Sequence, residues 1–477
     1  MKKLPKPALL LGLVTCSITL TAQKKDKEAM IAAIDARMEE YSGIAHQIWE
    51  FAEVGYQEVQ SSALLQQQLE KEGFVIEKGV AKIPTAFTAT FGAGEPVIGI
   101  LGEFDALPGL SQKAEPSKDP VIVGGAGHAC GHHLFGTASL AAAVALKDWL
   151  QDNNRRGTVR FYGTPAEEGG SGKVYMVREG LFEDVDVVIQ WHPGDRNATA
   201  VATSLANKTG KFRFYGVASH AAVAPERGRS ALDGVEAMNM MVNMMREHTT
   251  EGSRIHYIIT RGGTAPNVVP DFAEVYYYVR HGDNEEVRAM FDRIVLAAQG
   301  AALGTETRMD YEVVSGVYSL LPNEPLAKVM DENLQMVGGV NYNAEELEFA
   351  EKISSSFGSK TLLSMAKTVG PIFYGEGKGS TDVGDVSWIV PTVGLRTATW
   401  VPGTAPHSWQ AVAAGGMSIG WKGMMVAAKS MALMGMDLFL DAKLIDAAKK
   451  DFEDRRGADF QYAPLLGDRA PALNYRN

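Results

Sequence analysis

Along the N-terminal half of the chain, short apolar runs alternate with longer stretches of helical periodicity. The helical spacing of apolar residues predicts helices over 28–60 and 61–72, and an alanine-rich stretch predicts another over 134–150. Short apolar runs predict strands over residues 87–91, 97–101, 158–162 and 186–190. The order of strands and helices is typical of an α/β domain, so we expect a mostly parallel sheet.

The pattern changes at about Lys208. Alternating polar and apolar residues predict strands over 211–217, 255–260, 272–280 and 307–315, and helical periodicity predicts helices over 230–248 and 285–303. Strand-helix-strand-strand-helix-strand is the order of a compact, ferredoxin-like α+β insert. The first of its helices is rich in methionine, which favours core packing, with an interface as the alternative.

The first 22 residues have the features of a secretory signal peptide. Three lysines within the first six residues precede an apolar run over 8–20, which is too short to span a bilayer with margin, and small residues follow it. Lipoprotein processing at Cys16 is the alternative, ranked second because Thr15 is a poor match to the small residue usually found there. We therefore expect an exported protein, periplasmic or secreted, with no membrane span in the mature chain.

Beyond Pro322, the helical pattern over 326–337 returns the chain to the first domain, followed by a strand over 390–399 and a long helix over 415–438. The expected organisation is a signal peptide (1–22), a larger domain in two parts (23–207 and 320–454), an inserted smaller domain (208–319) and an irregular tail (455–477). Hydrophobic and charged contents of 45% and 22% are those of a globular protein. The net charge of −11 leaves no electrostatic footprint for nucleic-acid binding.

A glycine-rich segment over 124–133 concentrates three histidines and a cysteine within six residues. Thiolate and imidazole are ligand types that suit zinc and similar metals. After removal of the signal, Cys130 has no disulfide partner, although exported proteins normally use cysteine in pairs. A metal site is therefore favoured, and a reactive or buried cysteine in a glycine-rich turn is the alternative.

Further ligand-type side chains follow predicted strands. Asp105, Glu167, Glu168 and His192 each lie just past a predicted strand end, and His407 lies in a loop that follows another strand. Open α/β sheets bind ligands at the carboxyl ends of their strands, so we expect these side chains to converge on one edge.

The adjacent carboxylates Glu167 and Glu168 have a simple alternative, because two neighbouring glutamates are usually just a solvated loop. Beside a metal they acquire separate tasks: one binds the ion, and the other takes a proton from activated water and passes it to the leaving group. This combination predicts a metallohydrolase acting on an amide.

These motifs resemble those of the dinuclear aminoacylase and carboxypeptidase-type metallopeptidases. Within them the chain is similar to the amidohydrolase branch of auxin-conjugate, hippurate and aminobenzoyl-glutamate hydrolases, and GGSGK and STDVGDVS indicate the last of these groups. The matching segments are IWEF at 48–51 with Gly55 and Glu58, GEFDALPG, GHACGHH, TPAEEGGSGK, QWHPG, SHAA, APNVVP, STDVGDVS and PGTAPHSW.

The resemblance implies two divalent metal ions, with Glu167 as the general base. The implied metal ligands are Cys130, His132, Glu168, His192 and His407. Asp105 and His133 would support the ligands without binding metal themselves; relatives often carry Asp or Asn at the position of His133. His128 would be a structural, hydrogen-bonded histidine. Mixed sulfur, nitrogen and oxygen ligation leaves zinc, manganese and cobalt open.

For the insert, the resemblance implies a lid through which two copies form a homodimer. His220 would reach the active site of the neighbouring subunit and stabilise the tetrahedral oxyanion. Asn267 and Arg280 would contact the substrate carboxylate, for which the planar guanidinium of arginine is well suited. The simple alternative for His220 and Arg280 is an exposed position on the surface of the insert.

The activity expected from these residues is metal-dependent hydrolysis of N-acyl or N-aroyl amino acids, such as aminobenzoyl-glutamate. A dipeptidase or aminoacylase on the same scaffold is the alternative. A cysteine amidase with Cys130 as nucleophile fits less well, because His132 is poorly placed as its base and the glutamates would have no role. A non-catalytic exported binding protein is the remaining alternative.

Overall fold

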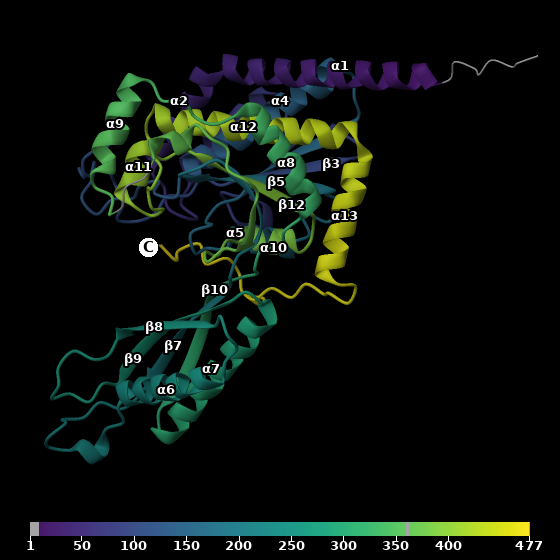
Figure 1. Cartoon of the computed structure of the whole chain (residues 1–477). Coiled ribbons are helices and arrows are strands. Elements are labelled where there is room, and N and C mark those ends of the chain that lie inside the picture. The colour runs from purple at the N-terminus through teal and green to yellow at the C-terminus, as the bar shows by residue number, and fades with distance from the viewer. Residues whose placement is uncertain (1–8, 359–361, 477) are drawn as a thin grey trace, which may run out of the picture.

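The computed structural model describes residues 9–358 and 362–476, with side chains from residue 23 onward. The chain forms a larger domain and a smaller one, which lie at opposite ends of the view in Figure 1. Each domain has its own hydrophobic core. Residues 1–8 of the expected signal peptide lie outside the described part, and residues 9–22 belong to the helix that opens it.

The larger domain is built on an eight-stranded sheet with the order β1-β2-β4-β3-β5-β12-β6-β11. The central neighbours β4, β3, β5 and β12 are parallel, and antiparallel strands flank them. The expected α/β fold with a mostly parallel sheet is thus confirmed. The strands are β1 Val75–Lys78, β2 Phe87–Ala93, β3 Val97–Gly102, β4 Gly157–Gly163, β5 Val187–Gly194, β6 Ala198–Thr203, β11 Phe373–Glu376 and β12 Thr392–Ala398.

Helices cover this sheet, and α4 and α12 pack against each other above β3 and β5 in Figure 1. Small residues permit the close approach: a Cβ on Gly423 of α12 would lie 2.5 Å from the Ala398 carbonyl oxygen of β12. The helices are α1 Leu9–Ala36, α2 Met38–Phe51, α3 Val59–Lys71, α4 His132–Asp152, α5 Gly172–Arg178, α8 Glu324–Val337, α9 Ala344–Ser354, α10 Val383–Ser387, α11 Trp409–Gly415, α12 Ser418–Leu440 and α13 Ala442–Arg456. Among the described residues, only α12 is long and apolar enough to cross a membrane, and 83% of its most apolar window is buried inside the protein.

Several element boundaries differ from the sequence prediction. The single helix expected over 28–60 is two helices, α1 and α2, which break at Arg37, and the second ends where Ala52 adopts a left-handed conformation with φ 44°. The helix α13 was not predicted, because it is strongly charged and packs only a few side chains, among them Ile445 and Phe452. The short edge strands β1 and β11 were also missed, since four residues carry too little periodicity.

The smaller domain has the order β7, α6, β8, β9, α7, β10, and its antiparallel sheet has the strand order β10-β7-β9-β8. This is the expected ferredoxin-like α+β domain. Both helices lie on one face, as Figure 1 shows, and leave the other face open. The elements are β7 Ala206–Tyr215, α6 Ala231–Met245, β8 Arg254–Arg261, β9 Phe272–His281, α7 Asn284–Gly304 and β10 Arg308–Val317.

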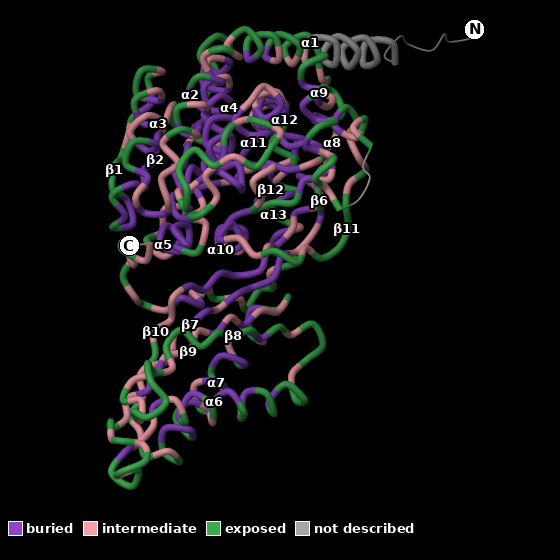
Figure 2. Tube along the Cα trace, turned by 90° about the vertical axis from the view of Figure 1, so that its left-hand side faces the viewer, coloured by how far each residue is buried: buried purple, intermediate pink, exposed green. Residues whose placement is uncertain are grey.

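Some methionines of α6 lie in the core and others are exposed, so the core and interface interpretations each apply to part of the helix. Met238 and Met245 are buried in the core of the smaller domain. Met240, Met241 and Met244 are exposed, and the tube in Figure 2 shows α6 alternating between buried and exposed positions. The helix therefore packs one methionine-bearing face and leaves another open.

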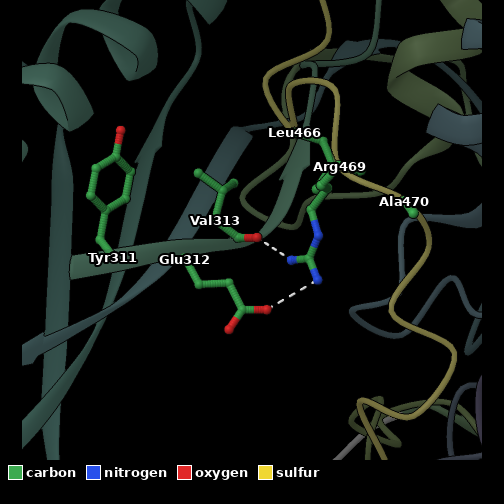
Figure 3. Close-up of a pocket in the computed structure, with 6 residues that line it drawn as sticks. All are labelled: Tyr311, Glu312, Val313, Leu466, Arg469 and Ala470. Carbon is green, nitrogen blue, oxygen red and sulfur yellow. Dashed lines mark hydrogen bonds and ion pairs between the residues drawn. The ribbon is translucent and has the colours of Figure 1, made fainter.

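The tail after α13 contains no further helix or strand within the described residues but contacts both domains. The Arg469 guanidinium donates to the Val313 carbonyl oxygen on β10 and pairs with Glu312, as Figure 3 shows. Arg178 of the larger domain donates to the Arg469 carbonyl oxygen at 2.8 Å. The tail thus connects the smaller domain to the larger one near the point where the chain passes between them.

Candidate metal centre

The site lies at the carboxyl ends of the four central parallel strands. Asp105 follows β3, and Glu167 and Glu168 follow β4. His407 lies in the loop beyond β12. His192 lies within β5, two residues before its end at Gly194, so the expectation that it follows the strand was wrong. Because these strands are neighbours in the sheet, their ends bring residues that are distant in sequence together.

Tight backbone turns hold the cysteine and the histidine at the start of α4. Gly131 between them has φ 80°, a conformation that L side chains rarely adopt, and a Cβ there would lie 2.7 Å from Pro193. Ala166, which precedes Glu167, and His407 also have positive φ, both 57°. Backbone strain of this kind is held in place where the surrounding structure requires it, often at functional sites.

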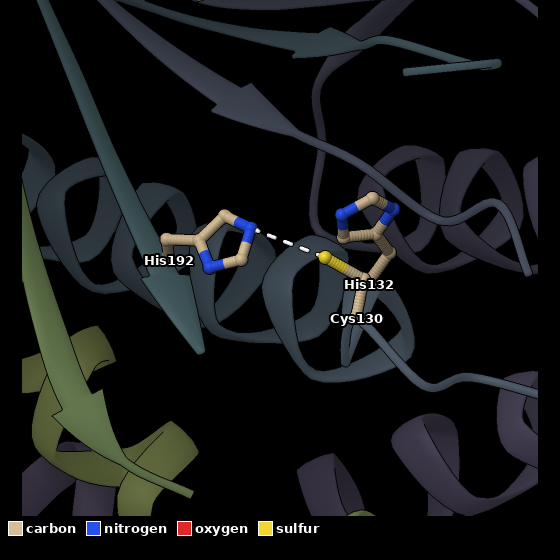
Figure 4. Close-up of side chains that lie close together, drawn as sticks. All are labelled: Cys130, His132 and His192. Carbon is tan, nitrogen blue, oxygen red and sulfur yellow. Dashed lines mark hydrogen bonds between the residues drawn. The ribbon is translucent and has the colours of Figure 1, made fainter. Parts of the chain in front are cut away.

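Two groups of ligand-type atoms share the Cys130 sulfur. In each group these atoms lie within 4.8 Å of one another: Cys130, His132 and His192 form one, and Cys130, Glu168 and His407 form the other. The Sγ of Cys130 is 3.4 Å from Nε2 of His192, the contact drawn in Figure 4. Glu168 Oε1 is 3.0 Å from Nε2 of His407. The structure therefore brings together all five side chains for which the sequence suggested metal binding.

The chemistry of these atoms fits divalent metal ions. Nε2 of His132 and Oε1 of Glu168 are buried and make no hydrogen bond of normal geometry within the described chain, although each has an ionisable neighbour, Glu103 Oε2 at 3.1 Å and His407 Nε2 at 3.0 Å. Buried polar atoms normally make well-formed hydrogen bonds, so a cluster of buried ligand-type atoms without them needs an explanation such as an ion. Sulfur, imidazole nitrogen and carboxylate oxygen together form a ligand set suited to zinc or manganese.

Burial raises the pKa of the Cys130 thiol, because the thiolate would be poorly solvated there. A buried thiol with a raised pKa is a weak nucleophile. A bound cation would have the opposite effect, since a coordinating thiol loses its proton. The environment therefore suits a metal ligand better than the nucleophile of a cysteine amidase.

Supporting hydrogen bonds fix the orientation of two ligand rings. Asp105 Oδ1 accepts a hydrogen bond from Nδ1 of His132 at 2.8 Å, and its other oxygen accepts from the Glu168 backbone N–H at 2.9 Å. The Pro193 carbonyl oxygen lies 2.7 Å from Nδ1 of His192. Each contact leaves Nε2 of the ring directed at the cluster, as in the carboxylate–histidine–metal arrangement of metalloenzymes.

His133, for which a supporting role was also expected, has different neighbours. Its Nε2 lies 3.0 Å from the Gly415 carbonyl oxygen, and its ring packs on that of His128 at 4.8 Å. His128 in turn contacts the Ile48 carbonyl oxygen at 3.0 Å. Burial lowers the pKa of both rings, that of His128 to about 3, so both are neutral. The pair joins α2, α4 and the end of α11 beneath the site.

The structure also reveals a buried ion triad that the sequence analysis did not assign. Lys173 Nζ lies 2.6 Å from Glu103 Oε1 and 2.7 Å from Asp382 Oδ1, and all three side chains are at most 1% exposed. The other Glu103 oxygen, Oε2, is 3.1 Å from Nε2 of His132. Each member lies in a segment that the resemblance had singled out, GEFDALPG, GGSGK or STDVGDVS, but their pairing requires the fold.

Glu167 lies beside this triad and the metal cluster. Its carboxylate, that of Glu103 and the His132 ring lie within 4.8 Å of one another. Burial raises the pKa of Glu167 well above its usual value, and the carboxylates of Glu103 and Glu168 raise it further. A carboxylate that holds a proton more tightly than usual suits proton transfer near neutral pH.

The residues expected in the insert lie apart from this cluster. His220 is exposed, and its Nδ1 accepts hydrogen bonds from the backbone N–H groups of Ala222 and Val223, at 3.2 and 3.3 Å. The carbonyl oxygen of Asn267 accepts from Ala221, so Asn267 and His220 share one loop region of the smaller domain. Arg280 is different, because its guanidinium reaches Ser380 Oγ of the larger domain at 3.4 Å.

Comparison with known proteins identifies the family. The model described as Peptidase family M20/M25/M40 matches residues 99–382, a range that contains four of the five clustered ligands. The chain belongs to this family. The resemblance based on its motifs is therefore confirmed, as is the enzyme class, a metal-dependent hydrolase of amide C–N bonds.

Individual relatives agree with this assignment. The chain is 40% identical over 468 residues to one of the subunits of the p-aminobenzoyl-glutamate hydrolase of Escherichia coli, covering 92% of this chain and 97% of the relative. It is 30% identical over 434 residues to the Xaa-Arg dipeptidase of Mus musculus, covering 88% and 90%. The fold is similar to that of a dinuclear metal-binding M20 peptidase of Bacillus subtilis, with a TM-score of 0.58, 18% identity and coverage of 85% and 99%.

Proposed function

We propose that this enzyme hydrolyses the amide bond of N-acyl or N-aroyl amino acids, with aminobenzoyl-glutamate as the substrate to test first. The observation that carries the proposal is the convergence of five metal-type ligands on one shared sulfur, with Glu167 beside them. The 40% identity to a component of an aminobenzoyl-glutamate hydrolase over nearly the full chain supports the substrate class.

Two divalent ions, manganese or zinc, are proposed as cofactors. Cys130 would be shared between them, with His132 and His192 on one side and Glu168 and His407 on the other. Divalent ions held there would polarise an amide carbonyl and lower the pKa of water towards neutrality. The similarity in fold to the Bacillus subtilis protein, a dinuclear metal-binding peptidase, supports the number of ions.

Glu167 is the proposed general base. Its carboxylate takes a proton from the attacking water and then delivers it to the leaving amine nitrogen. Asp105 holds the His132 ring in the tautomer that directs Nε2 at the site. Lys173 pairs with Glu103 and offsets its negative charge. Without Lys173, Glu103 would be an uncompensated carboxylate beside Glu167.

A homodimer through the smaller domain is proposed to complete the site. β8 is the edge strand of its sheet and exposes Ile258 and Ile259, which are 62% and 43% exposed, and α6 exposes Met240 and Met244 beside it. Exposed edges with apolar side chains favour pairing with another chain. His220, for which no contact with the metal cluster of its own chain is seen among the described residues, would then act in the neighbouring subunit. Asn267 and Arg280 would contact the substrate carboxylate.

Mixing inactive variants tests the dimer. Glu167→Gln and His220→Ala would each be inactive alone, but a mixed dimer contains one site with both native residues. We expect recovered activity in the mixture, together with a dimeric mass in light scattering. Absence of recovery in mixtures that do exchange subunits would place His220 outside the active site.

A dipeptidase is the second candidate, because of the 30% identity to the mouse Xaa-Arg dipeptidase. A hydrolysis screen separates the two candidates. The enzyme, loaded in turn with Mn²⁺, Zn²⁺ and Co²⁺, is offered aminobenzoyl-glutamate, hippurate, acetyl-methionine and the dipeptide Ala-Arg. We expect the highest kcat/KM on aminobenzoyl-glutamate. Faster cleavage of Ala-Arg would replace this proposal with the dipeptidase, and tight binding without turnover under every metal would indicate a binding protein.

Export is also proposed, on the basis of the basic and apolar sequence of the first 22 residues. N-terminal sequencing of the protein recovered from its native host distinguishes the alternatives. A start at or near Gln23 indicates signal peptidase, a lipid-modified start at Cys16 indicates lipoprotein processing, and an intact Met1 contradicts export.

A further inference from the structure

A cationic pocket lies where the open face of the smaller domain's sheet meets the larger domain. Its volume is about 590 Å³, and its lining residues come from β8, β9, the residue before β7 and the segment after β11. The lining residues are Leu205, Arg254, His256, Tyr278, Arg280 and Lys378. Three cations and no acidic residue line it, and one of the three, Lys378, pairs with the exposed Glu376 at 3.2 Å. The two arginines therefore make the pocket suited to an anionic ligand.

Arg254 and Arg280 face each other across neighbouring strands of this sheet. They are register partners in the β8–β9 pair, and His256 pairs with Tyr278 next to them. Residues directly opposite each other in a sheet point to the same face, and like charges in that position are destabilising. The two guanidinium groups therefore repel each other across the pocket.

Neither arginine has a carboxylate partner in the described part of the chain. Arg254 donates to the Ser253 carbonyl oxygen, and Arg280 donates to Ser380 and lies over the Tyr278 ring. Arg213 on the same sheet shows the contrast, since it pairs with Glu274 and Glu312, each at 2.8 Å. The described residues thus supply carboxylate partners for Arg213 but none for Arg254 and Arg280.

The pocket is connected to the metal centre by a short series of contacts. Ser380, which accepts from Arg280, lies two residues before Asp382 of the buried triad. Through Lys173 and Glu103 that triad reaches the His132 ring. Because Arg280 lines this pocket, the other cations of the pocket lie next to the first carboxylate of any substrate that Arg280 holds.

We propose that this pocket binds a second carboxylate of the substrate, with Arg254, His256 and Lys378 as the residues that determine this specificity. The enzyme then prefers conjugates of dicarboxylic amino acids, and glutamate conjugates extended by a further glutamyl residue, to conjugates of neutral or basic amino acids. Arginine suits this role because its planar fork binds carboxylate through two hydrogen bonds. The inference rests on the proposed amidohydrolase function.

The test compares substrates that differ only in the second carboxylate. kcat/KM is measured for aminobenzoyl-glutamate and aminobenzoyl-leucine, and the ratio of the two defines the acidic preference. Arg254→Gln should lower this ratio roughly tenfold, mainly through KM for the glutamate conjugate, as expected for loss of one charge-assisted contact. Arg261→Gln is the matched control, because Arg261 is an exposed arginine on the same strand outside the pocket, and it should keep the native ratio.

Two results would overturn the inference: an unchanged ratio in Arg254→Gln, or an equal fall in both control and test variants. If the native enzyme hydrolyses no aminobenzoyl conjugate, the proposed function fails, and the pocket is then judged by binding alone. Calorimetric titration with the dipeptide Glu-Glu should show binding at least roughly fivefold weaker in Arg254→Gln than in Arg261→Gln. Equal binding in that experiment would reject the pocket as a carboxylate site.

Discussion

Replacing Lys173 by methionine would break the buried ion triad and leave two carboxylates facing each other. Both Glu103 and Asp382 lie within 2.7 Å of the lysine nitrogen, and the side chains are inaccessible to solvent or nearly so. Removing one partner of a buried ion pair typically costs about 3–5 kcal/mol, because an uncompensated charge remains in a poorly solvated place. We expect the free energy of unfolding of the larger domain to fall by about that amount.

The tryptophans allow this loss to be measured mainly in the larger domain. All seven lie in that domain and none between residues 208 and 319, and only Trp388 among them also packs against the core of the smaller domain, so tryptophan fluorescence during urea unfolding reports mainly the larger domain. Lys429→Met is the control, because Lys429 pairs with Asp35, whose side chain is 49% exposed. Such partly exposed pairs contribute roughly 1 kcal/mol or less.

The charge argument also predicts a rescue. If the loss comes from stranded carboxylates, adding Glu103→Gln and Asp382→Asn to Lys173→Met should recover most of it, since replacing a whole buried ion group is often close to neutral. A loss below about 1 kcal/mol in Lys173→Met would show that the site is well solvated and refute the reasoning. A large loss that the triple variant does not recover would assign the effect to packing instead of charge.

Three further predictions concern the site and its surroundings. Glu167→Gln should lower kcat by roughly 10²–10⁴-fold while metal content, measured by atomic emission, stays native, because only the proton acceptor is lost; native turnover would exclude Glu167 as the base. Asp105→Asn should weaken metal binding by roughly 10–100-fold in a competition titration with a chelator, because the hydrogen bond that orients His132 is impaired; unaltered affinity would contradict that role. Burial raises the pKa of Asp385 from 3.8 to about 7, so its contribution to stability is complete below about pH 4 and is lost as the pH rises to about 7. As the pH rises from about 4 to 8, the free energy of unfolding of Asp385→Asn should therefore increase relative to that of the native protein by up to about 4 kcal/mol. A difference between the two proteins that does not change with pH would refute the raised pKa of Asp385.

Much of the architecture could be predicted because hydrophobic periodicity is a local property of the sequence. The alternation over residues 272–280 and the helical spacing over 285–303 correspond to β9 and α7 almost to the residue. The break between α1 and α2 at Arg37 was not visible, since the apolar spacing continues across it. The helix expected over 415–438 corresponds to α12, which begins at Ser418, whereas the short α11 before it, Trp409–Gly415, was not predicted.

For the site, the sequence determined which donors are available, and the fold determined which of them meet. Cys130 can be singled out in the sequence because it is an unpaired cysteine among glycines and histidines, and Glu167 and Glu168 because they are adjacent acids just past a predicted strand. The triad of Glu103, Lys173 and Asp382 joins residues 70 and 209 positions apart, and no local pattern marks such a pairing.

The sequence by itself therefore determined the order of the main elements, the two-domain α/β plan and the set of chemical groups, since each depends on neighbours within a turn or a strand. Only the tertiary structure decided that Arg254 stands opposite Arg280, that Glu103 is held by a buried lysine, and that the tail places Tyr475 on the Glu168 carbonyl oxygen at 3.0 Å. Strand register and domain packing set these contacts, and both depend on burying apolar surface across the whole chain instead of on any single segment.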